Sequence, residues 1–313
     1  MDIQDLSASL KNLQHNGVCF NPEERLQLEM SLQNLLNNAA ETEFEELLFW
    51  GKIQGLNGDY YIAVGLVFTG RYEFAEKRFY YCTSGDFTFR AFPTLNDQHK
   101  DKYDKISTVL TGNPKLVLPG GQVEPVKVPG EGGEGAEGDQ VAKKTVKEID
   151  PLASSEEEDP NALIVPVNMK EIDRVHYLVR AIENDCHVIP QGAIKLTTAH
   201  EVARNESFKG LSSGEAFTLS HYSHFRNVQS KDKKEGLEKD DAIYQRNFLD
   251  DVSADKPPHG CWCIQRDAAT GTIAILRNLM WPGSYAYHKA GTRVFGSIYI
   301  GDGQKNTDLA FMV

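Results

Sequence analysis

The sequence predicts an α+β fold, in which N-terminal helices pack on antiparallel β-hairpins and a second half combines helices with another antiparallel sheet. Three observations favour this class. They are leucines at helical spacing near the N-terminus, aromatic-rich runs joined by Asn-Gly and Gly-Asp turns, and further runs of that kind after residue 260. The β segments of each half are too short for a self-sufficient core, so the halves, residues 1–118 and 162–313, can share one sheet.

The first 44 residues are expected to be helical. Leu6, Leu10 and Leu13 recur at spacings of four and three residues, as one face of a helix requires. A second helix is expected from residue 21, because an asparagine, a proline and two glutamates follow in the order of an N-cap, a first helical position and a first turn. Its leucines fall mostly on one stripe and are Leu26, Leu28, Leu32, Leu35 and Leu36.

Residues 49–66 carry four glycines, a tryptophan and two tyrosines, so the stretch has the composition of either a ligand-binding loop or a hairpin. Asn57-Gly58 lies between two runs of β-forming residues, and Asn-Gly is the strongest short-range hairpin signal. Glycines inside such runs mark bulges or close backbone approach. We therefore predict a hairpin, followed by a second strand pair turning at residues 84–86 and by a helix over residues 95–110.

Residues 119–161 differ in composition from the rest of the chain. Runs such as "PGEGGEGAEGD" and "SSEEEDPN" show no periodicity and contain almost no large apolar residues. We predict a disordered acidic linker or a long surface loop between the two halves.

Beyond this linker the pattern again predicts helices and strands. Residues 167–186 are expected to form an amphipathic helix, because four β-branched residues share one face: Ile172, Val175, Val179 and Ile182. The other expected elements are a strand and turn at 187–196, a helix at 211–225 capped by Ser212 or Ser213, a short helix around 242–249, and strands within 261–267, 272–281 and 293–303.

Trp281-Pro282-Gly283 is expected to end one of these strands, because proline has no backbone N–H to donate to a sheet. Gly283 permits a tight turn that brings Tyr285 and Tyr287 back toward the sheet. Aromatic residues fill cores, and tyrosine and tryptophan are also enriched at the centres of protein interfaces. Trp281, Tyr285 and Tyr287 are therefore candidates for a partner interface, with a corner of the core as the alternative.

Composition excludes several classes of function. The net charge is −12, from 33 basic and 45 acidic residues, and such a chain repels nucleic acid and anionic membranes. No segment has the apolar length of a signal-peptide core or a membrane span. The five cysteines are odd in number and lack the spacing of a disulfide framework, which favours reduced thiols in the cytosol.

No motif predicts a catalytic or cofactor-binding site, so we expect no enzyme and no cofactor. Residues 130–135 match G-x-G-x-x-G, but they lie in the acidic run, without the strand and helix that a dinucleotide site needs. No G-x-S-x-G motif or phosphate-binding loop is present either.

Two groups of residues could in principle bind a metal ion, and we expect that neither does. His259, Cys261 and Cys263 alternate on an expected strand, but two core cysteines beside a surface histidine are the preferred interpretation. His221 and His224 are three residues apart in an expected helix without a neighbouring carboxylate motif, so a hydrogen-bonded pair is preferred.

Six motifs in order give the chain a family resemblance. They are "LFWGKIQGLNGDYYIAVGL", "IPQGA", Asn205 with Phe208-x-Gly210-Leu211, "LSHYSHFR", "LRNLMWPGSYAYH" and "GSIYIGDGQKNTDLAFM". Together they resemble the radial spoke head protein 9 family of cilia and flagella, from the first helices to the C-terminus, and Trp281-Pro282-Gly283 is also similar to the 4/6-type spoke head proteins. The acidic insert at 119–161 and the cysteines at 261 and 263 depart from the family pattern.

The resemblance implies a non-enzymatic building block of the radial spoke head in the axoneme, within the cytoplasm and cytoskeleton of a cilium or flagellum. The implied partners are 4/6-type proteins and other spoke head subunits in a large hetero-oligomer, with transient contact to central-apparatus projections. Its implied role is to help assemble the head and to pass signals to the dynein arms.

A second hypothesis does not use the resemblance. A soluble enzyme or small-ligand-binding protein could use the glycine- and aromatic-rich hairpins as a pocket. It requires Trp50, Tyr60 and Trp281 around an enclosed cavity, with His221 or Asp302 inside. Flat aromatic surfaces covered by a partner would instead favour the spoke head.

Overall fold

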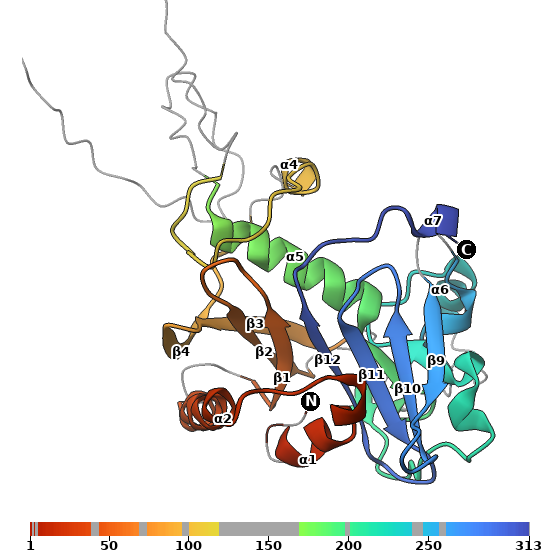
Figure 1. The fold of residues 1–313 in the computed structure, drawn as a ribbon. Coiled ribbons are helices and arrows are strands. Elements are labelled where there is room, and N and C mark those ends of the chain that lie inside the picture. The colour runs from red at the N-terminus through yellow and green to blue at the C-terminus, as the bar shows by residue number, and fades with distance from the viewer. Residues whose placement is uncertain are drawn as a thin grey trace, which may run out of the picture. The chain divides into compact units, whose positions relative to one another are not determined.

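The computed structural model describes residues 1, 3, 6–38, 44–68, 74–95, 100–118, 169–197, 201–239, 247–256 and 261–312. The chain divides into two compact units, of which the larger consists of Met1–Leu116 and Lys170–Val313. All the helices and strands with labels in Figure 1 belong to this larger unit. The expected acidic linker at 119–161, the glycine motif at 130–135 and His259 all lie outside the described residues.

One eight-stranded sheet contains strands from both halves of the sequence (Figure 1). Its order is β4-β3-β2-β1-β12-β11-β10-β9, and every neighbouring pair is antiparallel except β1 and β12. The strands are β1 (Glu46–Ile53), β2 (Tyr60–Val67), β3 (Glu76–Thr83), β4 (Asp86–Ala91), β9 (Trp262–Arg266), β10 (Ile273–Asn278), β11 (Ser284–Lys289) and β12 (Phe295–Gly301). The α+β class and the shared sheet are confirmed, whereas the parallel pair was not predicted.

The parallel pair β1–β12 joins the two halves through a close backbone approach at Gly51. Gly51 pairs with Tyr299, and the register of β1 against β2 shifts between Phe49 and Gly51, so the expected irregularity at this glycine is present. Gly51 has a φ of 149°, and a Cβ atom there would lie 2.1 Å from the carbonyl oxygen of Tyr299. Only glycine therefore allows the strands to meet at this point.

Helices α1 (Leu6–Lys11) and α2 (Pro22–Asn37), with a 3₁₀ turn η1 (Gln14–Asn16) between them, form the expected N-terminal helical segment. Asn21 and Glu24 make the capping box of α2, as the sequence predicts. Leu28, Leu32 and Leu35 are buried. Leu26 is the exception to the predicted stripe: it precedes Leu28 by two residues, which is more than half a helical turn, and its side chain is exposed.

The two faces of β2 pack on different helices. Tyr60, Ile62, Val64 and Leu66 belong to one hydrophobic cluster with the buried residues of α5 (Glu171–Cys186), while Tyr61 and Ala63 belong to another with the leucines of α1 and α2. All eight residues of β2 are consequently buried. The amphipathic face predicted for α5 is confirmed, because Ile172, Val175, Val179 and Ile182 are all buried.

The remaining elements are short. They are α4 (Lys100–Tyr103), β5 (Val188–Pro190), β6 (Ile194–Leu196), β7 (Val202–Arg204), η3 (Glu215–Phe217), η4 (Leu219–His221), β8 (Tyr222–His224), α6 (Lys231–Glu238), η5 (Val252–Ala254) and α7 (Leu309–Met312). The strand and turn expected at 187–196 are present as β5 and β6. Helix α6 was not predicted, and the helix expected around 242–249 falls mainly outside the described residues; residues 247–249 are not helical.

Two predicted helices are wrong for identifiable reasons. The stretch 211–225 forms two 3₁₀ turns and β8, because β8 pairs with β5 and the Tyr222 hydroxyl donates to the Ala216 carbonyl oxygen at 2.6 Å. Of residues 95–110, the described part is helical only in α4. The guanidinium of Arg174 donates to two carbonyl oxygens of this stretch, that of Ile106 at 2.8 Å and that of Thr108 at 2.6 Å.

The close approach at Gly51 predicts a large loss of stability in Gly51→Ala. The added methyl group meets the Tyr299 backbone and the positive φ is strained, so we expect the free energy of unfolding to fall by about 3 kcal/mol or more. Urea denaturation of the full chain measures this. Gly85→Ala is the matched control, because no atom lies within 4 Å of its Cβ position and its φ is not positive. Equal stability of the two variants would contradict the role assigned to Gly51.

Candidate functional site

Among the described residues, the cysteine and histidine candidates other than His259 lie apart from one another or bind to other side chains. No group of three or more His, Cys, Asp or Glu side chains suitable for a metal ion occurs among the described residues. Cys261 and Cys263 are free thiols, half-buried at β9. His221 and His224 do not share a helix; His224 is buried in β8 and its Nε2 lies 2.8 Å from Asp255 Oδ2. None of the described helices is both long and apolar enough to cross a membrane.

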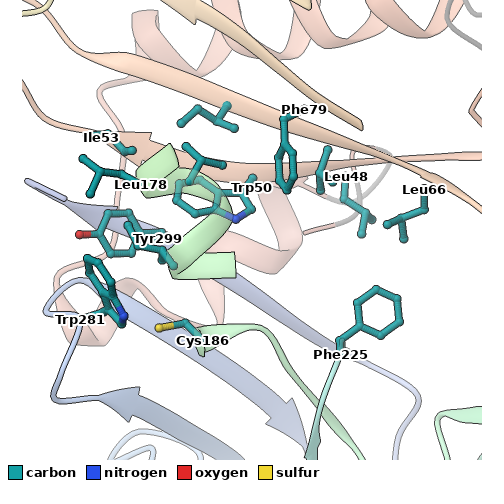
Figure 2. Close-up of a cluster of buried hydrophobic side chains, with 14 of the residues drawn as sticks. Leu48, Trp50, Ile53, Leu66, Phe79, Leu178, Cys186, Phe225, Trp281 and Tyr299 are labelled. Carbon is teal, nitrogen blue, oxygen red and sulfur yellow. The ribbon is translucent and has the colours of Figure 1, made fainter. Parts of the chain in front are cut away.

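The aromatic residues required for an enclosed pocket instead anchor α5 to the sheet. Trp50, Tyr60 and Trp281 are buried, and Figure 2 shows Trp50 and Trp281 in the core with Tyr299 and Leu178. Each donates a hydrogen bond to a carboxylate of α5: Trp50 Nε1 to Glu183 Oε2 at 2.9 Å, the Tyr60 hydroxyl to Glu171 Oε1 at 2.7 Å, and Trp281 Nε1 to Asp185 Oδ2 at 3.0 Å. These contacts favour a structural role for the three rings.

The turn predicted at Trp281-Pro282-Gly283 is present, but the strand before it ends earlier than predicted. Strand β10 ends at Asn278, Gly283 has a φ of 97°, and β11 returns alongside β10. The exposed fractions of Trp281 and Tyr287 are only 4% and 2%. Tyr285 is half-buried, and the Arg277 guanidinium lies 5.2 Å from the centre of the Tyr285 ring. Of the three interface candidates, Tyr285 alone offers substantial surface to a partner.

An open groove of about 1450 Å³ lies elsewhere, between the edge of the sheet and α5. Its described walls come from β3, the segment after β4, α5, α6 and the segment after β8. Trp50, Tyr60, Trp281, His221 and Asp302 are not among the described lining residues. The groove is thus separate from the pocket that the second hypothesis required.

The floor of the groove is a buried ionic network centred on Glu183. The Lys77 ammonium donates to Glu183 Oε1 and to the Phe225 carbonyl oxygen, both at 2.6 Å, and His187 Nδ1 lies 2.5 Å from the same carboxylate oxygen. Burial lowers the pKa of His187, although the Glu183 carboxylate opposes this shift, and the imidazole donates through Nδ1 because a carboxylate oxygen only accepts. Burial alone would raise the pKa of Glu183, but His187 and Lys77 outweigh this through charge and hydrogen bonds and hold it low.

One wall of the groove is aromatic. The His176 ring stacks on Phe92 with centroids 4.7 Å apart, and His176 Nδ1 lies 2.9 Å from the Pro93 carbonyl oxygen. The Phe79 ring is tilted relative to the same imidazole, with centroids 6.3 Å apart. Burial lowers the pKa of His176 to about 4, so the imidazole in this wall is neutral at neutral pH.

Sequence reasoning did not find the groove. Lys77 and Arg180 lie within an expected strand and an expected helix, and Lys234 lies in a stretch for which no helix was predicted. The groove forms where β3, α5 and α6 lie close together. Local sequence patterns do not predict contacts between elements so far apart in the chain. The one signal for the groove in the sequence is a lysine at position 77, on the same strand face as Phe79 and Tyr81, and this signal is weak.

The lowered pKa values predict that acid destabilises the protein below neutral pH. Unfolded histidine, with an ordinary pKa of about 6.5, binds protons that folded His176 excludes until about pH 4. Stability from this group is therefore complete above pH 6.5 and declines as the pH falls from 6.5 to 4. We expect His176→Gln to flatten the pH dependence of the free energy of unfolding, measured by urea denaturation between pH 7 and pH 4. His15→Gln, at an exposed histidine, is the control; identical profiles for wild type and His176→Gln would contradict the prediction.

Comparison with known proteins identifies relatives of full length. A family model described as a radial spokehead-like protein matches residues 1–78 and 182–313. The chain is 30% identical over 316 residues to the radial spoke head protein 9 homologues of Mus musculus and Homo sapiens, with 100% of both chains covered. It is 31% identical over 313 residues to the homologue of Danio rerio, again with full coverage of both chains.

The matched residues include the segments that build the junction of the sheet. Residues 1–78 contain α1, α2, β1 and β2, and residues 182–313 contain β9 to β12. The family match thus covers both strands of the parallel pair that joins the two halves. The chain belongs to the radial spoke head family, as a homologue of radial spoke head protein 9.

Proposed function

We propose that this chain is a structural, non-enzymatic subunit of the axonemal radial spoke head in cilia and flagella. In this role it helps assemble the head and transmit signals between the central apparatus and the dynein arms. The observation that carries the proposal is the similarity to radial spoke head protein 9 homologues, at 30% identity over the whole of both chains. No observation on the described residues specifically favours the enzyme or small-ligand alternative.

The fold supports the role of a building block. One sheet passes through both halves of the sequence, and its inner strand β2 is buried on both faces by the chain's own helices. Hydrogen bonds from Trp50, Tyr60 and Trp281 fix α5 on the sheet. Packed interiors of this kind transmit strain rather than absorb it, which suits a subunit that passes on mechanical signals.

Exposed apolar side chains support assembly with other subunits. Leu26 and Met30 are 58% and 60% exposed and lie four residues apart, on one face of α2. Leu56, at the tip of the β1–β2 hairpin, is 70% exposed. Large exposed apolar residues that cluster mark protein contacts more often than single ones do. We propose 4/6-type proteins and other spoke head subunits as partners in a large hetero-oligomer.

The net charge supports a transient contact with central-apparatus projections. An excess of 12 negative charges gives the surface a repulsive field toward other acidic proteins. Such repulsion lets two surfaces touch repeatedly without adhering. The proposed location is accordingly the axoneme of a cilium or flagellum.

The proposal predicts that the chain is an integral part of axonemes. A tagged copy expressed in ciliated cells should remain with detergent-washed axonemes, enter the high-salt extract, and co-sediment there with 4/6-type spoke head proteins. Quantitative mass spectrometry of the gradient fractions measures this. An axonemal tubulin-binding protein of similar mass that is not a spoke component serves as the control. Release with the detergent-soluble fraction would refute the assignment.

Tyr285 allows a test of the interface proposal with an internal control. Tyr285→Ala should leave the unfolding free energy of the isolated chain within about 1 kcal/mol of wild type, while incorporation into spoke heads falls. Tyr287→Ala, on the same strand but buried, should lose about 3–5 kcal/mol, as for other buried aromatic residues truncated to alanine. Normal incorporation of Tyr285→Ala would show that this corner is not an interface.

A further inference from the structure

The groove between β3, α5 and α6 has the chemistry of a peptide-binding site. We propose that it holds an extended acidic segment of a neighbouring subunit, with one apolar side chain of that segment seated against Phe79 and Phe92. The proposal rests on the proposed function, because it assumes that the chain works within a hetero-oligomer, and it names the chemistry of one partner.

The charge of the groove is opposite to that of the chain. The chain carries 12 more acidic than basic residues, yet five of the described lining side chains are basic and two are acidic. The basic residues are Lys77, Arg78, Arg180, Arg226 and Lys234, and the acidic ones are Glu76 and Glu183. Each glutamate already has a cationic partner: Glu76 is paired with Arg78 at 3.2 Å, and Glu183 is paired with Lys77 at 2.6 Å. The charge that is left over is positive.

Two of these cations retain hydrogen-bonding capacity toward a ligand. Arg180 on α5 and Lys234 on α6 are exposed, and no described acidic residue forms an ion pair with either. Arg226 is not counted with them, because it donates through Nη1 to the Asn184 carbonyl oxygen at 2.8 Å and lies 3.9 Å from Asp185 and 4.0 Å from Asp250. The chain's own carboxylates thus already balance the charge of Arg226.

The aromatic wall supplies the apolar part of the site. Phe92 is half-buried and stacks on the neutral imidazole of His176, and the Phe79 ring lies beside the same imidazole in a tilted arrangement. An apolar or aromatic side chain between two acidic residues would be covered by these rings while its neighbours reach Arg180 and Lys234. Extended peptides are commonly read in this way, with charges setting the position and pockets selecting side chains.

The size and charge of the groove favour a peptide over other ligands. Its volume of about 1450 Å³ exceeds the range of about 300–1,000 Å³ that is usual for small-molecule pockets. Nucleic acid would meet the repulsive field of a chain with a net charge of −12. A short acidic segment places its charges only inside the basic groove. It therefore meets less of the repulsive field of the rest of the surface than a nucleic acid does.

Fluorescence anisotropy with the full chain tests the proposal. The probe is a labelled peptide of about twelve residues, rich in glutamate with one central phenylalanine. We expect saturable binding that weakens with added salt, that is lost when the glutamates become glutamines, and that weakens several-fold when the phenylalanine becomes alanine. Two competitors are tested beside it: oligo(dT) of similar length, and a peptide of this chain's own acidic residues 150–161.

Charge reversal locates the binding. Arg180→Glu with Lys234→Glu should weaken binding of the peptide by about tenfold or more, since two attractive contacts become repulsive. Lys209→Glu with Lys289→Glu is the matched control, because it changes the net charge equally at two exposed lysines outside the groove lining. Both double variants replace exposed side chains, and circular dichroism checks that both remain folded.

The outcomes separate the possibilities. Absence of binding, or equal loss in the two double variants, would overturn the proposal. So would tighter binding of oligo(dT), or of the chain's own 150–161 peptide, because the occupant would then not be a partner's acidic segment. If the chain sediments with spoke heads but does not bind the peptide, the groove assignment fails and the proposed function stands. If it binds the peptide but is absent from axonemes, the proposed function fails instead.

Discussion

The buried carboxylate of Glu183 is the interaction on which the arrangement of α5, β1 and β3 depends. Glu183 is 5% exposed and accepts from three donors: Trp50 in β1, Lys77 in β3 and His187 at the end of α5 itself. A buried charge without partners is strongly unfavourable, and breaking a buried ion pair by removing one partner costs about 3–5 kcal/mol. Since the donors come from separate elements, the carboxylate is satisfied only when helix and sheet are correctly aligned. The network therefore selects one position of α5 on the sheet.

The other end of α5 is fixed by the same chemistry. Glu171, on the first turn, accepts from the Tyr60 hydroxyl and from the backbone N–H groups of Thr111 and Gly112. Arg174 donates to carbonyl oxygens of the preceding irregular stretch. An extended segment without its own ladder of hydrogen bonds is thus ordered by the helix beside it, as buried backbone groups require. Helix α5 is consequently bonded both to the sheet, through Tyr60, and to the irregular segment at residues 106–112.

Local signals in the sequence predicted the elements whose causes are local, and they failed where distant residues decide. The Asn57-Gly58 hairpin, the Asn21 cap and the apolar face of α5 depend on neighbours within a few residues, and all are present. The parallel pairing of Gly51 with Tyr299 joins residues that are remote in the chain, and only a glycine inside a strand pointed to a close approach of unknown partner. The helix expected at 211–225 does not form, because β8 pairs with the distant strand β5 instead. The groove could not be predicted for the same reason, because its basic residues come from β3, α5, α6 and the segment after β8.

The order of the sheet explains where the groove lies. Strands β1 and β2 lie inside the sheet and are covered by α5 on one face and by α1 and α2 on the other. Toward the edge, β4 is held from the α2 side, where Phe87 stacks on Tyr61 and its carbonyl oxygen accepts from Ser31, while its α5 side is not closed by that helix. The same Glu183 network that fixes α5 over β1 and β3 thus sets the width of the opening beside it. Lys77 belongs to both features, since its ammonium neutralises Glu183 and its strand forms the wall of the groove. Stability of the core and geometry of this surface are for that reason coupled through one ion pair.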